Sequence, residues 1–69
     1  MTLSNEDKTE IVLQHIRNLE YNKYNLSLSL LEENSVTDPN ESVVKSLQAQ
    51  INDVDTKLGI LQTELEKNK

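Results

Sequence analysis

Apolar residues recur in two runs along this chain, each with alternating steps of three and four positions. The second run is unbroken, whereas in the first run one step is filled by a lysine. Such spacing places side chains on one face of an α-helix and is typical of a coiled-coil seam. We therefore predict two helices whose seam residues are Thr9, Val12, Ile16, Leu19, Lys23, Leu26 and Leu30 in the first, and Val44, Leu47, Ile51, Val54, Leu58, Leu61 and Leu65 in the second.

The two runs fit each other when the helices are antiparallel. Opposite residue numbers then sum to 73 or 74 throughout, as for Leu30 with Val44 and for Lys23 with Ile51. The same sum puts the turn near residue 37, next to Pro39, the only proline. The sequence predicts an all-α fold, an antiparallel two-helix hairpin of coiled-coil type that spans residues 1–69 as a single domain.

Local signals predict a first helix over about residues 4–34. Ser4 can cap this helix while Asp7 occupies its third position, and Asn34 can close it in a left-handed conformation. Residues 25–30 alternate apolar and polar side chains, which is the period of a strand. No second strand is available to pair with them, so we expect them to stay helical.

The turn is predicted at about residues 35–38, followed by a second helix over about 39–67. Asp38 is suited to the N-cap, and Pro39 to the first helical position, where its missing N–H costs nothing. Glu41 would then complete a capping box. Two ion pairs between residues four apart are expected within this helix, Glu41 with Lys45 and Asp53 with Lys57.

Composition narrows the classes of function. The chain has 69 residues, a formal net charge of -5, two aromatic residues and no cysteine. Its negative charge disfavours binding to nucleic acid. Because no stretch approaches the roughly 20 apolar residues of a membrane span and the N-terminus has no signal-peptide pattern, we expect a cytoplasmic protein without membrane contact.

Residues that carry chemistry are sparse. His15, the only histidine, lies beside the predicted seam, and no carboxylates converge on it to complete a metal site. Two straight helices offer no cleft that would desolvate an acid–base pair of carboxylates. Nucleophile triads, phosphate-binding glycine loops and Cys-x-x-Cys motifs do not occur in the sequence. We therefore expect no enzyme, and no metal, cofactor or small-molecule substrate.

A second apolar stripe lies on the first helix, away from the seam, and consists of Tyr21, Tyr24, Leu28 and Leu31. These residues are predicted to form a protein-interaction surface. The alternative is that they cover a partly exposed hairpin or cap its loop end. Stability favours the first interpretation, because one narrow seam hardly offsets the entropy of ordering the chain. We expect a homodimer, a larger homo-oligomer or a complex with another protein.

Lys23 interrupts the seam and allows two interpretations. A charged residue at a core heptad position can fix the register or the number of helices that associate, at some cost in stability. In the second interpretation the aliphatic stem packs in the seam while the ammonium group reaches water.

Three short stretches of the first helix resemble a known group of proteins, as does the order of this helix, a loop and a Gln/Asn-rich heptad helix. The stretches are Asn18–Tyr21 (NLEY), Lys23–Asn25 (KYN) and Leu30–Asn34 (LLEEN). On these features the chain resembles small two-helix proteins of T-even-like marine phages of the cyanophage type. The resemblance implies a phage origin and the host cytoplasm, and it implies no activity.

In layout the chain is also similar to the two-helix RNA-binding hairpins of plasmid copy-number control, but it lacks their basic face.

Two hypotheses of function follow. The first is a non-enzymatic protein–protein interaction or structural module. The alternative is an acidic regulator that blocks a nucleic-acid-binding protein by charge mimicry. The second hypothesis requires a continuous acidic stripe, yet seven basic residues are scattered among the twelve acidic ones. Salt distinguishes the two, because it weakens charge mimicry far more than apolar association.

Overall fold

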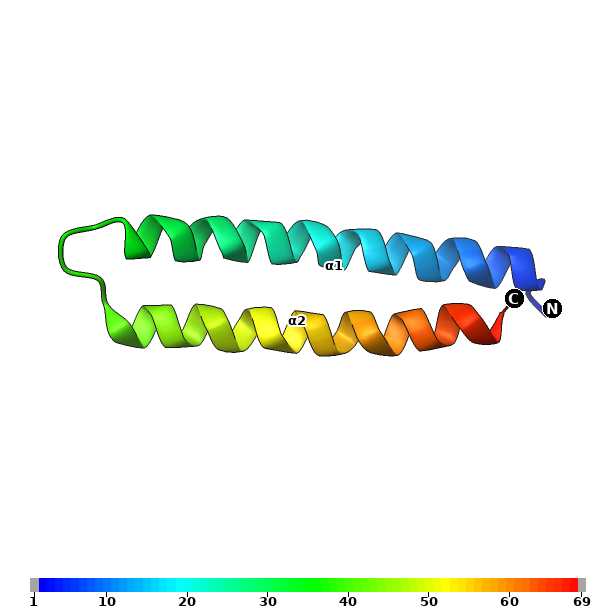
Figure 1. Ribbon diagram of the computed structural model, residues 1–69. Helices are drawn as coiled ribbons and strands as arrows, with labels where there is room; N and C mark the ends of the chain where they lie inside the picture. The colour runs from blue at the N-terminus through cyan, green and yellow to red at the C-terminus, as the bar shows by residue number, and fades with distance from the viewer. Residues whose placement is uncertain (1, 69) are drawn as a thin grey trace.

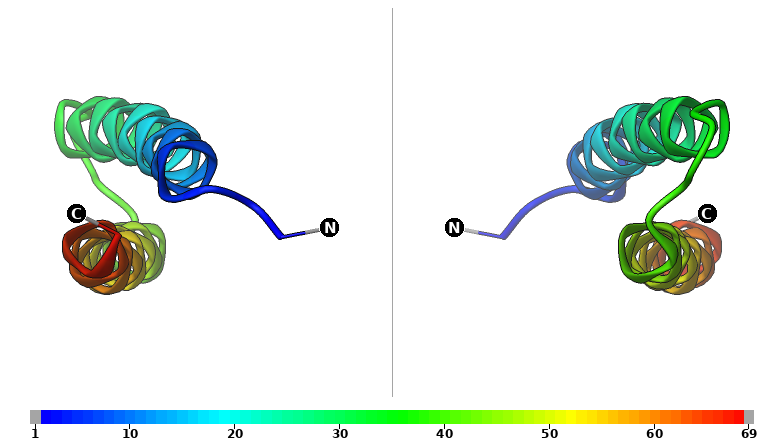
Figure 2. Two further views of the ribbon diagram at one scale, coloured as in Figure 1. Left: turned by 90° about the vertical axis from the view of Figure 1, so that its right-hand side faces the viewer. Right: turned by 90° about the vertical axis from the view of Figure 1, so that its left-hand side faces the viewer.

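The computed structural model describes residues 2–68, which form two helices, α1 (Asn5–Asn34) and α2 (Glu41–Lys67). The helices run antiparallel and side by side, with the loop at one end and both chain ends at the other (Figure 1). The molecule measures 55 × 18 × 15 Å, and the end-on views show α1 and α2 next to each other, joined by the loop (Figure 2). The predicted all-α helical hairpin is confirmed.

Residue exposure follows the predicted seam. Val12 and Val54 are buried, and every other seam position of the two helices is half-buried. Neighbouring positions on both helices are almost all exposed, so the contact between α1 and α2 is confined to the seam residues. This narrow contact agrees with the strict two-in-seven apolar pattern, which suits a pair of helices rather than a bundle with a shared core.

Residues 25–30 are helical despite their alternating pattern, and α1 passes through them without a break. A strand needs a neighbour that satisfies its backbone N–H and C=O groups, whereas a helix satisfies them internally. Leu26 and Leu30 also occupy seam positions, where both residues are half-buried in the helical conformation. The seam therefore outweighs the short strand-like alternation.

The ends of α1 are satisfied by local hydrogen bonds. Ser4 is the N-cap, and its Oγ accepts from the Asp7 backbone N–H at 3.1 Å, as predicted. The expected left-handed closure at Asn34 is wrong, since no residue between 2 and 68 has a positive φ. The helix ends at Asn34, and the C-cap residue Ser35 keeps a right-handed conformation. Ser35 Oγ donates to the Leu31 carbonyl at 2.7 Å, and its N–H donates to the Glu32 carbonyl at 3.2 Å.

The start of α2 differs from the prediction. Asn40, not Asp38, is the N-cap, and its Oδ1 accepts from the N–H groups of Ser42 and Val43. Pro39 therefore lies outside the helix, and the loop extends over residues 35–40. The Asn40 N–H is bound by Glu33 Oε1 at 2.9 Å, across the loop. Glu33 thus takes the place that Glu41 was expected to have in the capping box, and α2 begins at Glu41 instead of at Pro39.

Candidate interaction surface

The four residues predicted to form an interaction surface are all exposed. Tyr21, Tyr24 and Leu31 are 66%, 65% and 62% exposed, and Leu28 is 38% exposed. We call these four residues the α1 stripe. They include both aromatic residues of the chain, and aromatic side chains contribute the largest apolar areas at interfaces.

Helix geometry accounts for the position of the α1 stripe. Tyr21 follows the seam residue Leu19 by two positions, and Tyr24 precedes Leu26 by two. Two residues correspond to about 200° of rotation around an α-helix. The α1 stripe therefore projects from the side of α1 that faces away from α2, where α2 cannot cover it.

The α1 stripe occupies only the half of α1 next to the loop. Toward the N-terminus, the same face carries the exposed polar side chains of Asp7, Glu10, Gln14 and Arg17. The residues of this face thus change from polar to apolar within one helix, while the steps of three and four residues between them continue. The apolar part is about 15 Å long, from the rise per residue of an α-helix. It is a localised patch on an otherwise solvated face.

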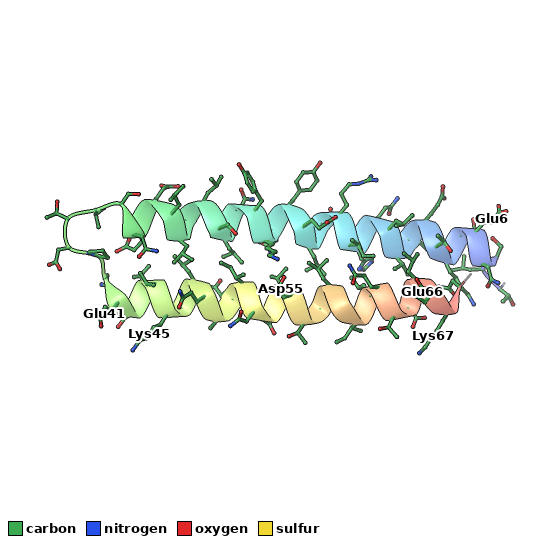
Figure 3. The ribbon with its side chains drawn as sticks, in the orientation of Figure 1. Glu6, Glu41, Lys45, Asp55, Glu66 and Lys67 are labelled. Atoms are coloured by element: carbon green, nitrogen blue, oxygen red, sulfur yellow. The ribbon has the colours of Figure 1, made fainter. Side chains whose placement is uncertain are left out.

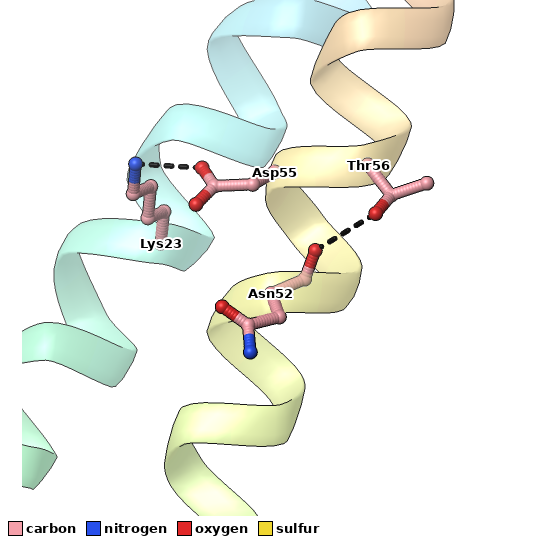
Figure 4. A network of polar contacts seen from close by, with 4 residues as sticks. All are labelled: Lys23, Asn52, Asp55 and Thr56. Atoms are coloured by element: carbon pink, nitrogen blue, oxygen red, sulfur yellow. Dashed lines mark hydrogen bonds and ion pairs between the residues drawn. The ribbon is translucent and has the colours of Figure 1, made fainter.

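Lys23 connects the helices at the edge of the seam. Its Nζ lies 2.6 Å from Asp55 Oδ1 (Figure 4), one helical turn beyond Ile51, the residue predicted opposite. Helical side chains tilt toward the N-terminus of their own helix. In an antiparallel pair, Lys23 and Asp55 therefore lean toward each other. The sum of 73 or 74 identifies the residues whose backbones lie opposite each other, and a long side chain can contact a residue one turn away from that position.

The ion pair also bears on the role of Lys23. The side chains of Lys23 and Asp55 remain 41% and 47% exposed, so the ammonium group lies at the hairpin surface. This geometry is the one expected when the stem packs in the seam and the head reaches water. Exposed pairs of this kind contribute about 0.2–1 kcal/mol to stability.

The structure shows a second apolar feature that the sequence analysis missed. A shallow groove of about 360 Å³ runs between the helices on one flank of the seam. Ile60 lies on its rim and is 63% exposed. The groove has one signal in the sequence, namely that Ile60 is apolar and lies outside the heptad positions of α2. The groove is lined by His15, Asn18, Leu19, Lys57, Ile60 and Leu61.

Charged side chains of both signs are interspersed along α2. Asp53 pairs with Lys57 at 3.2 Å, as predicted, and Lys67 pairs with Glu64 at 3.8 Å. The expected pair of Glu41 and Lys45 is not among the ion pairs formed within residues 2–68; both side chains lie at the loop end of α2 (Figure 3). The opposite end holds Glu6, Glu66 and Lys67 (Figure 3).

Within residues 2–68, no three His, Cys, Asp or Glu side chains are grouped so that they could hold a metal ion. Neither helix in that part of the chain has the length and apolar character needed to cross a membrane. Comparisons of the chain with protein-family models, curated proteins and solved structures find no match. Function must therefore be inferred from the surface of the hairpin itself.

Proposed function

We propose that this protein is a non-enzymatic protein–protein interaction module that associates through the α1 stripe. The supporting observation is the exposure of Tyr21, Tyr24, Leu28 and Leu31 on the far side of a helix whose other side already packs on α2. Tyrosines beside leucines give a patch that is apolar over most of its area and can still donate hydrogen bonds. The resemblance to marine-phage proteins supports the cytoplasm of an infected host as the place of action.

The small core supports the same proposal. Among residues 2–68, Val12 and Val54 alone are buried. The radius of gyration is 16.1 Å, compared with about 11 Å for a compact domain of this length. Folding costs about 1.5 kcal/mol of conformational entropy per ordered residue, and a seam buried on one side offsets little of it. Association through the α1 stripe would add apolar burial on the second face of α1.

The mass in solution, measured by light scattering over a range of concentrations, tests the proposal. We expect the wild type to associate, and the double variant Tyr24→Ala/Leu28→Ala to associate about 10–100-fold more weakly, because two contact side chains are truncated. The matched control is Asn52→Ala/Thr56→Ala, with the same spacing of four on the exposed far face of α2. This control should leave the mass unchanged.

Salt separates this proposal from charge mimicry of a nucleic acid. Association through Tyr and Leu side chains should persist at about 1 M salt, where the Debye length is only about 3 Å. A loss of association at high salt, or an equal effect of the α1 and α2 double variants, would contradict an apolar contact through the α1 stripe.

A further inference from the structure

The spacing of the α1 stripe residues is symmetric along the helix. Its steps are three, four and three residues, so the stripe can pack against a second copy of itself when the two helices run antiparallel. We propose that two hairpins associate through their α1 helices, antiparallel, about a two-fold axis at the level of Leu26. This inference rests on the proposed function and adds the partner and the geometry.

In this arrangement the numbers of two stripe residues that pair across the interface sum to 52. Tyr21 of one copy lies against Leu31 of the second copy, and Tyr24 lies against Leu28. The two-fold axis repeats both contacts, so four layers pair an aromatic ring with a branched aliphatic side chain. A shift by one helical turn in either direction would leave a tyrosine or leucine of the stripe without an apolar partner.

The residues that flank the stripe are compatible with this register. The two-fold axis brings each flank of the stripe against the same flank of the second copy, so the paired numbers sum to 50 on one side and to 54 on the other. Next to the axis, Asn25 faces Asn25 of the second copy and Ser27 faces Ser27, which are small or amide side chains. Farther out, each acidic residue meets an amide: Asn18 meets Glu32, and Glu20 meets Asn34. Like charges therefore do not face each other along the flanks, although α1 carries several carboxylates.

Arg17 selects the antiparallel orientation. It continues the stripe toward the N-terminus, is exposed, and forms no ion pair within residues 2–68. In the antiparallel dimer it lies opposite Ser35, the C-cap of the second α1. The last turn of α1 has no basic residue of its own, and a cation is favourable at that end of a helix. In a parallel dimer, Arg17 would instead face Arg17.

The area of the stripe limits the strength of this dimer. The exposed parts of four such side chains amount to roughly 400–500 Å² per copy, so the interface buries on the order of 1,000 Å² in total, the lower limit for specific contacts. We therefore expect a weak, concentration-dependent dimer. Because the stripe lies nearly opposite the seam, the four helices form a flat row with the two α1 helices in the middle.

Thiol cross-linking tests the geometry, because the chain has no cysteine of its own. The variants Asn18→Cys and Glu32→Cys replace exposed residues that lie opposite each other in the proposed dimer. A short bismaleimide should link a mixture of the two into a covalent dimer. It should link neither variant to itself, because the two copies of position 18 lie roughly 24 Å apart along the helix axis and the two copies of position 32 roughly 18 Å apart. Asn52→Cys, on the far face of α2, is the control and should not be linked.

Each outcome decides between the geometry and the proposed function. Linking of Asn18→Cys to itself, or no linking although light scattering shows a dimer, overturns the antiparallel α1 contact and leaves association through the stripe standing. A monomer at every concentration overturns both. Loss of the mixed product when Tyr24→Ala/Leu28→Ala is added supports both, provided that circular dichroism shows unchanged helix content in the variants.

Discussion

The two helices have similar seams and different far faces. Each contributes a row of residues at steps of three and four to the contact between them. On the side away from this contact, α1 carries two tyrosines and two leucines, whereas α2 carries small or polar residues, with the single exposed Ile60 at the edge of this face. The far face of α2 consists of Ser42, Lys45, Ala49, Asn52, Thr56, Gly59, Thr63 and Glu66.

This difference separates two uses of an amphipathic helix. The helix α2 has one apolar face, and α1 covers it. The helix α1 has two, and α2 covers one of them. Exposed apolar residues scattered singly need no explanation, but the α1 stripe is contiguous and helically spaced. The asymmetry therefore supports the proposal that association takes place through α1 and not through α2.

The shared seam is where the largest effect is expected. Insertion of one alanine after Ile51 rotates the following part of α2 by about 100°, so that Val54 and Leu58 leave the contact with α1. We expect loss of the cooperative thermal transition and of most helical circular dichroism at 25 °C. Insertion of one alanine after Thr37, in the loop, is the control and should cost far less, because loops tolerate added length. Similar melting curves for the two insertions would contradict the seam.

Conversion of the α1 far face to the character of the α2 far face should remove association and preserve the hairpin. The variant Tyr21→Gln, Tyr24→Lys, Leu28→Gln and Leu31→Glu replaces the stripe with polar residues that favour helix. Sedimentation should show association weakened by more than about 100-fold, because every apolar contact of the interface is lost. Helical circular dichroism of the dilute variant should match that of the wild type. An unchanged mass would show that the stripe is not an interface.

The hairpin could be predicted from the sequence because its determinants are periodic. The seam residues repeat over the length of both helices, so single exceptions such as Lys23 do not hide the pattern. The strand-like residues 25–30 were correctly expected to be helical for the same reason. The α1 stripe was visible in the sequence because it has its own helical period, and its four residues are exposed in the structure. Its role as an interaction surface stays a prediction.

Features that depend on one contact between distant residues could not be predicted in this way. Asp38 and Asn40, just before α2, are both suitable N-cap residues. The carboxylate of Glu33, seven residues earlier than Asn40, accepts from the Asn40 N–H and so favours Asn40. The pairing of Lys23 with Asp55 follows from side-chain tilt and not from the number sum. Ile60 lacks a helical repeat, so the groove beside it left no pattern to detect.

Replacement of the charged seam residue should have a moderate effect. Lys23→Leu adds apolar burial worth about 1–2 kcal/mol and removes an exposed ion pair worth at most about 1 kcal/mol. The midpoint of thermal unfolding should therefore rise by several degrees. Measurement in the stripe-converted variant excludes a contribution from association. Asp55→Asn, which removes the ion pair and keeps Lys23, is the control and should lower the midpoint slightly. A changed number of associated copies would instead show that Lys23 sets the oligomeric state.

The smallest expected effect concerns the far face of α2, where helix propensity alone should act. A Cβ added at Gly59 meets no atom within 4 Å, so Gly59→Ala should stabilise the hairpin by about 0.5–1 kcal/mol, with no change in association. The exposed Ala49 on the same face gives the reverse control, since Ala49→Gly should cost about as much. The two changes should cancel in the double variant, because the sites lie about 15 Å apart along α2. A change in solution mass for any of the three variants would mean that the far face of α2 also binds a partner, and the contrast with α1 would then fail.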